Sequence, residues 1–276
     1  MLSAGILSWK AHGTLRATLA TCAPLREAAG DCVVFFNEIT DSDRELAAQF
    51  GFRAEGSTEN LGILGGTRGL VSCMRGDEII LLQNDNPVNV PPDVFAARIA
   101  EARALLASGG ADMIRLRDRF DKSFSDAPKY LRYWPGEAER DTLALKLRRL
   151  MRPFKARRMA GRAHAALRNP ETAHPDIFER SGGIVVADSR FIDYSDQPFL
   201  ARRSLAAELL DWAEAHKEGN RTLNGLPVPE IIINGTGWRG RGLKIGVSDG
   251  VFAHRRLDDS FRPDNAAYNA SIAAGA

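Results

Sequence analysis

The first 120 residues alternate strand-like and helix-like segments over short connections, and this rhythm limits the folds open to the chain more than any other feature. The segments that we predict as strands cover residues 4–9, 32–39, 52–56, 77–82 and 111–118. The segments that we predict as helices, or as a loop that enters one, cover residues 14–28, 41–51, 57–76 and 94–110. Such an alternation predicts an α/β fold with a mostly parallel open sheet and helices on both faces.

The fourth predicted strand holds four consecutive apolar residues, 79–82, between the Gly76-Asp77 turn signal and Pro87. A run this short fits a strand buried on both faces better than a helix, which needs about 10 residues or more. Asp85 follows it, at the carboxyl end of the strand, where ligands bind in open α/β sheets. Its carboxylate is therefore a candidate metal or ligand group. The alternative is a turn residue that bonds its own backbone before Pro87.

Composition indicates a soluble globular protein, because 44% of the 276 residues are hydrophobic and 26% are charged. No apolar segment approaches the roughly 18 residues that cross a bilayer, and the amino terminus lacks the features of a secretory signal. Cys22, Cys32 and Cys73 have no metal-ligand spacing, which suits a reducing compartment. We therefore expect a cytosolic protein.

The second half of the chain is less regular. Residues 182–188 predict a strand and residues 198–219 a helix, and a glycine-rich stretch follows. No internal repeat or low-complexity linker divides the sequence. We therefore expect a single domain over residues 1–276, with a helical insertion at residues 133–172.

Residues 140–168 are strongly basic, with Asp141 as the only acid. Apolar residues recur in this segment at helical spacing, so we expect helices that pack against the protein; these residues are Leu143, Leu147, Leu150, Met151 and Phe154. The charge indicates either a solvated helical face or a docking surface for an anionic membrane, an acidic acceptor or nucleic acid. Nucleic acid is the weakest of these interpretations, because no binding motif accompanies the charge.

Polar groups follow each of the first four predicted strands. Because the carboxyl ends of parallel strands lie at one edge of a sheet, these groups should converge on one crevice; they include Ser8, Trp9, Lys10, Asn37, Glu38, Glu59, Asn60 and Asp85. The sequence has neither GxGxxG after the first strand nor GxxxxGK(S/T), which argues against a dinucleotide oxidoreductase and a P-loop enzyme. A diphosphate ligand would then need another source of positive charge, such as a divalent metal on Asp85.

Four motifs in order, SWK, FFNEITDSD, ENLG and QNDNP, resemble the nucleotide-binding half of GT-A fold glycosyltransferases of family 2. The later GVFAHRRLD resembles the ending of small bacterial enzymes of this group. The resemblance covers residues 1–120 and, more loosely, residues 182–259. It implies a nucleotide-sugar-binding half in the first range and an acceptor and catalytic half in the second.

The resemblance also assigns roles at the strand ends. It implies that Glu38 contacts the nucleobase, that Asn60 shapes the donor pocket and that Asp85 ligates a metal bridging two phosphates. Gln83 stands where the family has the first acid of Asp-x-Asp, a departure that removes one negative charge. The residues that we expect to bind the nucleotide-sugar are Ser8, Trp9, Glu38, Asn60, Gln83, Asn84, Asp85 and Arg255.

His254 matches a position where some enzymes of this fold supply a second metal ligand, and imidazole suits manganese. The alternative is a surface histidine in a basic turn beside Arg255 and Arg256, whose charges would instead stabilise the leaving diphosphate. Inverting transfer also needs a general base. The resemblance places an acid at the start of a helix, where Glu230 is the best match and Asp188 a weaker one, as is Asp193.

The resemblance therefore implies a metal-dependent inverting glycosyltransferase of polysaccharide biosynthesis, which uses Mn or Mg to move a sugar from a nucleotide diphosphate donor to a glycan or lipid-linked acceptor. Residues 140–168 would add a peripheral contact with the inner face of the membrane. No nucleic acid partner is expected. The alternatives are a sugar-nucleotide pyrophosphorylase and a non-catalytic nucleotide-sugar or carbohydrate-binding module.

Overall fold

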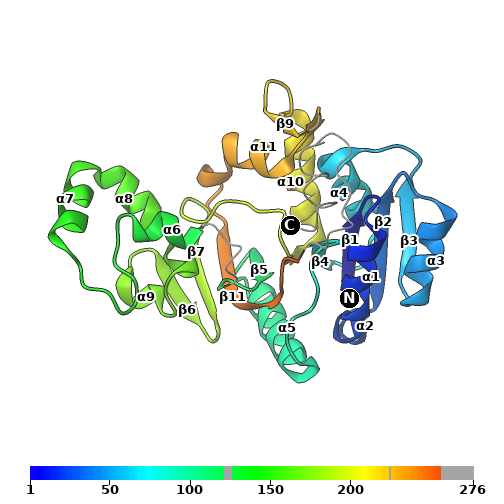
Figure 1. Ribbon diagram of the computed structural model, residues 1–276, viewed down its shortest axis with the longest axis horizontal. Helices are drawn as coiled ribbons and strands as arrows, with labels where there is room; N and C mark the ends of the chain where they lie inside the picture. Colours follow the sequence, from blue (N-terminus) through cyan, green and yellow to red (C-terminus); the bar gives the residue numbers. More distant parts are fainter. Residues whose placement is uncertain (121–125, 224, 256–276) are drawn as a thin grey trace, which may run out of the picture.

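The computed structural model describes residues 1–120, 126–223 and 225–255, and its centre is a nine-stranded sheet in the order β3-β2-β1-β4-β8-β5-β11-β7-β6 (Figure 1). The strands of this sheet are β1 (Leu2–Ser8), β2 (Asp31–Asn37), β3 (Arg53–Ser57), β4 (Glu78–Gln83), β5 (Met113–Arg117), β6 (Phe178–Ser181), β7 (Ile184–Asp188), β8 (Phe199–Arg202) and β11 (Lys244–Phe252). A small second sheet pairs β9 (Thr222–Leu223) with β10 (Leu226–Pro227).

The helices are α1 (His12–Ala20), α2 (Ala23–Ala28), α3 (Asp41–Gln49), α4 (Gly62–Cys73), α5 (Pro92–Ala107), α6 (Asp126–Leu131), α7 (Leu143–Met151), α8 (Pro153–Ala160), α9 (Pro170–Ala173), α10 (Arg203–Ala215) and α11 (Pro229–Gly235), with short 3-10 turns η1 (Ala163–Ala165) and η2 (Trp238–Gly240). Within the described ranges, none of these helices has the length and apolar character needed to cross a bilayer.

Most strands of the sheet share one direction. β1 is parallel to β2 and β4, β2 is parallel to β3, and β5 is parallel to β11. β8 runs antiparallel between β4 and β5, and β7 runs antiparallel between β11 and β6. Only β7 and β8 therefore oppose the other seven strands of this sheet, and the predicted mostly parallel open sheet is confirmed.

The apolar run 79–82 explains why helices cover both faces. Side chains alternate between the two faces of a strand, so Ile79 and Leu81 join one apolar cluster and Ile80 and Leu82 join the other. The first cluster includes residues of α4, α10 and α11, and the second includes residues of α1, α2, α3 and α5. The predicted helices on both faces are confirmed.

Two segments differ from the prediction. Residues 14–28 form two helices rather than one, because Pro24 has no N–H to continue a helix and instead lies in the first turn of α2. Residues 198–219 begin with β8 rather than with helix, since residues 199–202 pair with both β4 and β5 and α10 begins only at Arg203. In the second case strand pairing overrides the local helical pattern.

The predicted helical insertion is present, and α7, α8 and α9 lie in it at the end of the molecule opposite to α3 (Figure 1). The expectation that its apolar residues pack against the protein is wrong. No residue of α7 is buried, because α7 lies at the outer end of the insertion, alongside α8.

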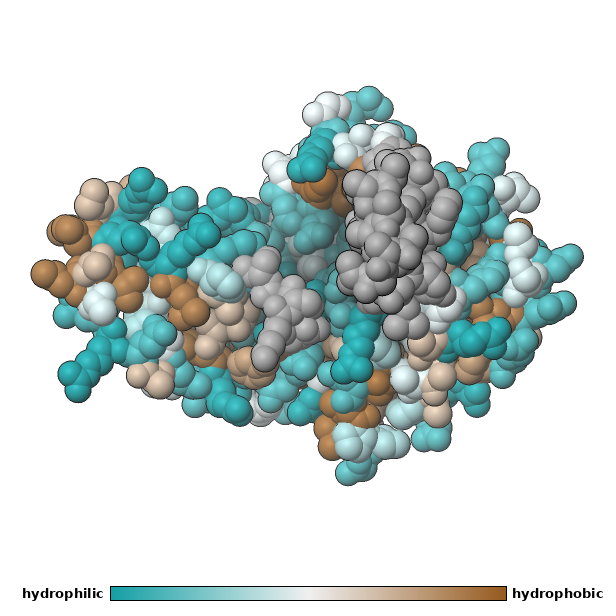
Figure 2. All heavy atoms as spheres, in the orientation of Figure 1, coloured by the Kyte–Doolittle hydropathy of each residue, from teal (hydrophilic) through white to brown (hydrophobic). Residues whose placement is uncertain are grey.

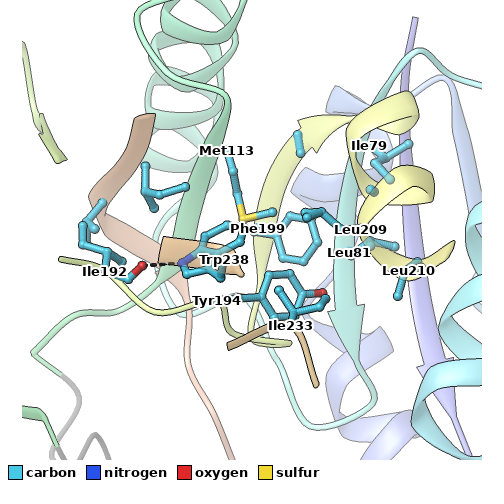
Figure 3. Packing of buried hydrophobic residues seen from close by; sticks show 14 of the residues in the cluster. Ile79, Leu81, Met113, Ile192, Tyr194, Phe199, Leu209, Leu210, Ile233 and Trp238 are labelled. Atoms are coloured by element: carbon cyan, nitrogen blue, oxygen red, sulfur yellow. Dashed lines mark hydrogen bonds between the residues drawn. The ribbon is translucent and has the colours of Figure 1, made fainter. Parts of the chain in front are cut away.

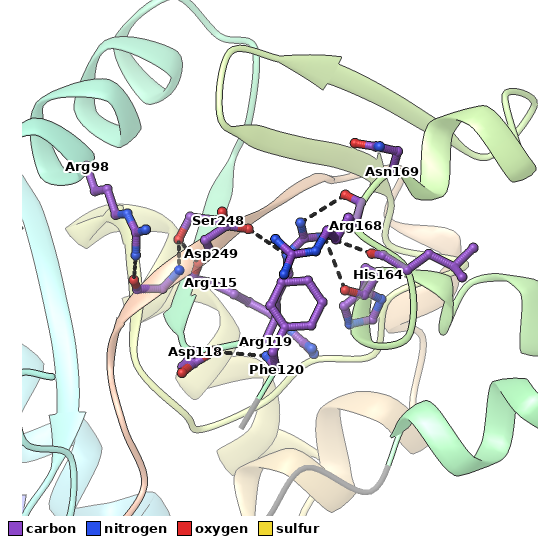
Figure 4. A network of polar contacts seen from close by, with 12 residues as sticks. Arg98, Arg115, Asp118, Arg119, Phe120, His164, Arg168, Asn169, Ser248 and Asp249 are labelled. Atoms are coloured by element: carbon purple, nitrogen blue, oxygen red, sulfur yellow. Dashed lines mark hydrogen bonds and ion pairs between the residues drawn. The ribbon is translucent and has the colours of Figure 1, made fainter. Parts of the chain in front are cut away.

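Arg119 binds the insertion to the sheet (Figure 4). This buried side chain follows β5, and its Nε donates to Asp249 Oδ1 in β11 at 2.8 Å. Its two Nη atoms donate to the backbone carbonyls of His164 and Arg168 at 3.3 and 3.0 Å. One guanidinium can satisfy several acceptors because it carries five N–H donors. Residues 164–168 are thereby fixed against β5 and β11.

Trp238 belongs to the core (Figure 3). It is 1% exposed, and its Nε1 donates to Ile192 O at 2.7 Å. The Tyr194 ring meets it edge-on with the centroids 5.5 Å apart. The indole thus fills the space between η2 and the segment that precedes β8.

We expect Trp238→Ala to lower the free energy of unfolding by about 3–5 kcal/mol, because it removes buried area and leaves a cavity. Trp238→Phe should cost about 1–3 kcal/mol, since it keeps an aromatic ring but leaves the Ile192 carbonyl without its donor. Urea unfolding followed by circular dichroism measures both. A Trp238→Ala protein with an unchanged midpoint would contradict the core assignment.

Candidate functional site

The strands β2, β1 and β4 are parallel neighbours, so their carboxyl ends form one edge of the sheet. Ser8 ends β1 and is buried, and Asn84 Nδ2 lies 3.4 Å from its Oγ. The Asn84 backbone N–H donates to Leu7 O at 3.0 Å, and Thr18 Oγ1 donates to Asn84 O at 2.7 Å. These bonds fix the loop after β4 against β1 and α1.

Glu38 joins the ends of β1 and β2. Its Oε2 accepts from Trp9 Nε1 at 2.6 Å and lies 2.9 Å from Lys10 Nζ. The Trp9 hydrogen bond, followed by the hydrogen bond and charge of Lys10, lowers the pKa of Glu38 from its ordinary value. Among the described residues, Lys10 and Glu38 are the only non-glycine residues with positive φ, at 47° and 57°. Such conformations cost energy and cluster at ligand sites.

Asn60 shapes the loop that enters α4. Its Oδ1 accepts from the Gly62 N–H at 2.9 Å, and Asn37 Oδ1 accepts from the Leu61 N–H at 3.2 Å. Gly62 has a φ of +66°, and a Cβ added there would lie 2.9 Å from Leu226 Cβ. The Asn-x-Gly motif therefore has a structural reason, because the turn requires glycine and the Asn side chain closes it.

Asp85 and His254 meet at this edge, although they come from distant parts of the sequence. Asp85 is fully buried, and its Oδ2 lies 3.2 Å from His254 Nε2. The Arg255 backbone N–H donates to the Asp85 carbonyl at 2.8 Å, so the chain beyond β11 runs along the loop after β4. The Arg255 side chain is exposed, and Arg256 lies outside the described residues.

This pair fits a divalent metal that is shared with a ligand. It offers one carboxylate and one imidazole, and manganese accepts both. Gln83, which ends β4, adds no charge. In the described part of the chain, no cluster of three His, Cys, Asp or Glu side chains could hold a metal. Protein sites for Mg²⁺ often use one or two carboxylates together with substrate phosphates, and the donor set here matches that arrangement.

Glu230 lies in the first turn of α11. Partial removal of water from its carboxyl raises the pKa of Glu230; Arg115 opposes this shift, and Asp193 and Asp126 add to it. A raised pKa moves a carboxylate toward the range of an effective general base at neutral pH.

Asp196 lies against Glu230 and was not identified from the sequence. Burial, followed by the Glu230 charge, raises the pKa of Asp196 to about 8. The next strand, β8, begins at Phe199, which pairs with Leu81 near the end of β4, so this pair of acids lies toward the same edge as Asp85. Neighbouring carboxyls with separated pKa values are typical of acid–base sites.

Asp188 does not join this edge. β7 runs antiparallel to β11, so Asp188 pairs with Lys244 at the start of β11, on the opposite edge of the sheet. Its carboxylate lies 3.0 Å from Arg190 Nη2 and accepts from the Arg190 backbone N–H at 2.8 Å. The interpretation of Asp188 as a catalytic acid or base therefore fails, because the reversed direction of β7 carries it away from Asp85.

A network of buried charged side chains near Glu230 was also not predicted from the sequence. Three arginines alternate along β5 and its continuation, and each is less than a tenth exposed; they are Arg115, Arg117 and Arg119. Arg162 lies 2.6 Å from Asp126 and also pairs with Asp193, which pairs in turn with Arg239. Two guanidinium groups therefore occupy the Asp193 carboxylate. The sequence MIRLRDR contained a signal for this network, because it places arginine at every second position and therefore on one face of the strand. Cations on one strand face require anionic partners.

No protein-family model matches this chain, and no curated protein matches it. Solved structures are similar to it. The crystal structure of S. aureus TarS 1-349 has a TM-score of 0.48 and 10% identity, over 94% of this chain and 61% of that one. Glucosyl-3-phosphoglycerate synthase from Mycobacterium tuberculosis, in complex with Mn²⁺, UDP and glucosyl-3-phosphoglycerate, has a TM-score of 0.46 and 14% identity, over 93% of this chain and 72% of that one.

A mycobacterial protein is similar at a TM-score of 0.48 and 16% identity, over 96% of this chain and 68% of that one. This chain thus spans about 61% of the length of the TarS fragment. TM-scores below 0.5 at such identities do not establish an activity, so the function has to come from the residues of this chain.

Proposed function

We propose that this chain is a glycosyltransferase that uses a divalent metal and moves a sugar, with inversion, from a nucleotide diphosphate donor to a glycan or lipid-linked acceptor. In this proposal residues 1–120 bind the donor, residues 182–259 carry the acceptor and catalytic groups, and residues 133–172 are an insertion. The observation that carries the proposal is the contact of Asp85 with His254 at the end of β4.

The donor side of the proposal rests on the groups at one sheet edge. Glu38, held by Trp9 and Lys10, is suited to hydrogen bonding with a nucleobase, because a carboxylate offers two acceptor oxygens. The strain at Lys10 and Glu38 supports a ligand role for this edge. Asp85 and His254 would hold the metal, which supplies positive charge for the diphosphate when it is bound.

The catalytic side of the proposal rests on Glu230 and Asp196. The acceptor oxygen attacks the anomeric carbon, the bond from that carbon to the diphosphate oxygen breaks, and Glu230 takes the acceptor proton. Asp196, with a pKa of about 8, keeps its own proton at neutral pH, so it does not compete for the acceptor proton.

We expect UDP or another nucleoside diphosphate to raise the Tm by several degrees when Mn²⁺ is present, and to have no effect in a chelator. A ligand that binds only the native state stabilises it by about 2.7 kcal/mol at about 100 times its Kd. A thermal-shift screen of nucleoside diphosphates with Mn²⁺ or with EDTA measures this. Mn²⁺ alone is the control, and an equal nucleotide shift in EDTA would refute the shared metal.

Gln83 favours a second candidate, a nucleotide-sugar-binding module without catalysis. It removes one of the two acids of the family motif and therefore weakens the case for tight metal binding. Hydrolysis or transfer of the donor sugar by the purified protein separates the two candidates, since a binding module would give the thermal shift alone. A pyrophosphorylase is less well supported, because SWKAHGTLR after β1 does not resemble a glycine-rich loop with Arg and Lys.

A further inference from the structure

Large apolar side chains project from the outer surface of α7 and α8. We define the docking face as five of these residues, which are more than half exposed: Leu143 at 82%, Leu147 at 54%, Leu150 at 78%, Met151 at 70% and Phe154 at 91%. Figure 2 shows hydrophobic surface gathered at this end of the molecule, beside strongly hydrophilic surface. Apolar area in water is unfavourable, and a contiguous patch of it marks an interaction site.

The docking face is surrounded by positive charge. The sequence has no acid between residues 142 and 169. The exposed cations of α7, α8 and the residue between them are Lys146, Arg148, Arg152, Lys155, Arg157 and Arg158. Helices that combine exposed apolar residues with Lys and Arg are typical of segments that lie in the interface of an anionic bilayer.

A groove of about 740 Å³ between α6, α7 and α8 is also lined by both apolar and cationic side chains. Its apolar lining includes Leu147, Met151 and Met159. Its cations are Lys129, Arg132, Arg148, Arg152 and Lys155. A phospholipid carries a phosphate next to its acyl chains, so it matches both the cations and the apolar lining of the groove. A soluble polyanion would match the charge alone.

The docking face belongs to a folded element. Trp134 Nε1 donates to Ala156 O in α8 at 3.0 Å, and the Arg149 guanidinium of α7 lies 4.5 Å from the Trp134 ring centroid. Arg149 also pairs with Asp141 at 2.5 Å. Beyond α8, Arg119 fixes residues 164–168 to the sheet. A surface that is formed before binding loses little conformational entropy when it binds.

We propose that α7 and α8 dock on an anionic phospholipid bilayer. The five residues of the docking face enter the boundary between headgroups and acyl chains, and the cations around them bind lipid phosphates. The proposal goes beyond the proposed transferase activity, because lipid binding requires neither donor nor acceptor. If lipid binding fails, the proposed transferase activity is therefore not refuted, and if transferase activity fails, lipid binding is not refuted.

Co-sedimentation with vesicles tests the proposal. We expect binding to vesicles of phosphatidylglycerol and phosphatidylcholine, weaker binding as salt rises, and little binding to phosphatidylcholine alone. The double variant Leu150→Ser/Phe154→Ser should weaken binding by about 10²-fold, because both side chains lose their insertion. Lys146→Glu/Lys155→Glu should weaken it to a similar extent at low salt, about 10²-fold.

Two control variants change exposed apolar and cationic residues elsewhere. Leu223→Ser removes an apolar side chain that is 55% exposed on β9. Arg16→Glu/Arg44→Glu reverses two exposed charges on α1 and α3, away from the insertion (Figure 1). Both should bind vesicles like the wild type. The proposal is overturned if the wild type does not bind at low salt, or if the controls lose as much binding as the docking-face variants. Loss in the charge variant alone would also overturn it, in favour of a soluble polyanion.

Discussion

Glu230→Gln should lower the turnover of sugar transfer by roughly 10²–10⁴-fold while donor binding is kept, because the amide retains the shape of the side chain but cannot accept a proton. In the wild type, the raised pKa of Glu230 should move the acidic limb of the activity profile above the ordinary range of a glutamate, since activity needs the ionised form. Transfer rates as a function of pH, together with the metal-dependent thermal shift, measure both effects.

Glu218→Gln is the matched control, because Glu218 is an exposed glutamate beyond the end of α10. It should keep full turnover. If Glu230→Gln keeps near-normal turnover, Glu230 is not the base, and Asp196→Asn becomes the next variant to measure. Asp193 is a weaker successor, since Arg162 and Arg239 occupy its carboxylate.

Asp85→Asn should abolish the metal-dependent thermal shift and lower transfer by about 10²-fold or more, because truncating a buried charged partner typically costs 2–5 kcal/mol of binding. The substitution keeps the volume of a fully buried side chain, so the fold should survive it. Binding and turnover should therefore fall together, in contrast to Glu230→Gln. Isothermal titration of a nucleoside diphosphate with Mn²⁺, beside the transfer assay, distinguishes the two patterns.

Asp31 provides a control that separates the loss of any buried carboxylate from the loss of the proposed metal ligand. It starts β2, at the edge of the sheet opposite to Asp85, and its Oδ1 lies 3.1 Å from Arg53 Nη2. Asp31→Asn should lower the Tm but leave the nucleotide shift intact. An Asp85→Asn protein that still binds the diphosphate with Mn²⁺ as tightly as the wild type would remove Asp85 from the metal site.

Local sequence was enough to predict the elements whose residue pattern indicates the same structure that their contacts in the fold require. The run 79–82 is a strand covered on both faces, as its four apolar residues indicated, and Asp85 follows its end. Thr40 caps α3 and forms a capping box with Asp43, so the start of this helix is fixed by residues within one turn. In these places a few neighbouring residues determine the structure.

Other features depend on contacts between distant segments, which a local pattern does not contain. β8 was missed because residues 199–202 become a strand only through pairing with β4 and β5. Asp196 was missed because its altered pKa arises from burial and from Glu230, which are brought to it by folding. Asp188 was misplaced because the direction of β7 is set by its antiparallel pairing with β11.

The position of β8 in the middle of the sheet has a consequence for the order of folding. Synthesis delivers β1 to β4 first, but the strand that completes the free side of β4 comes only after the whole insertion. Until β8 arrives, β4 has an unpaired edge, which is a hazard for aggregation. His254 arrives later still, so the Asp85 pair closes after the last strand of the sheet has joined. The proposed site therefore forms late.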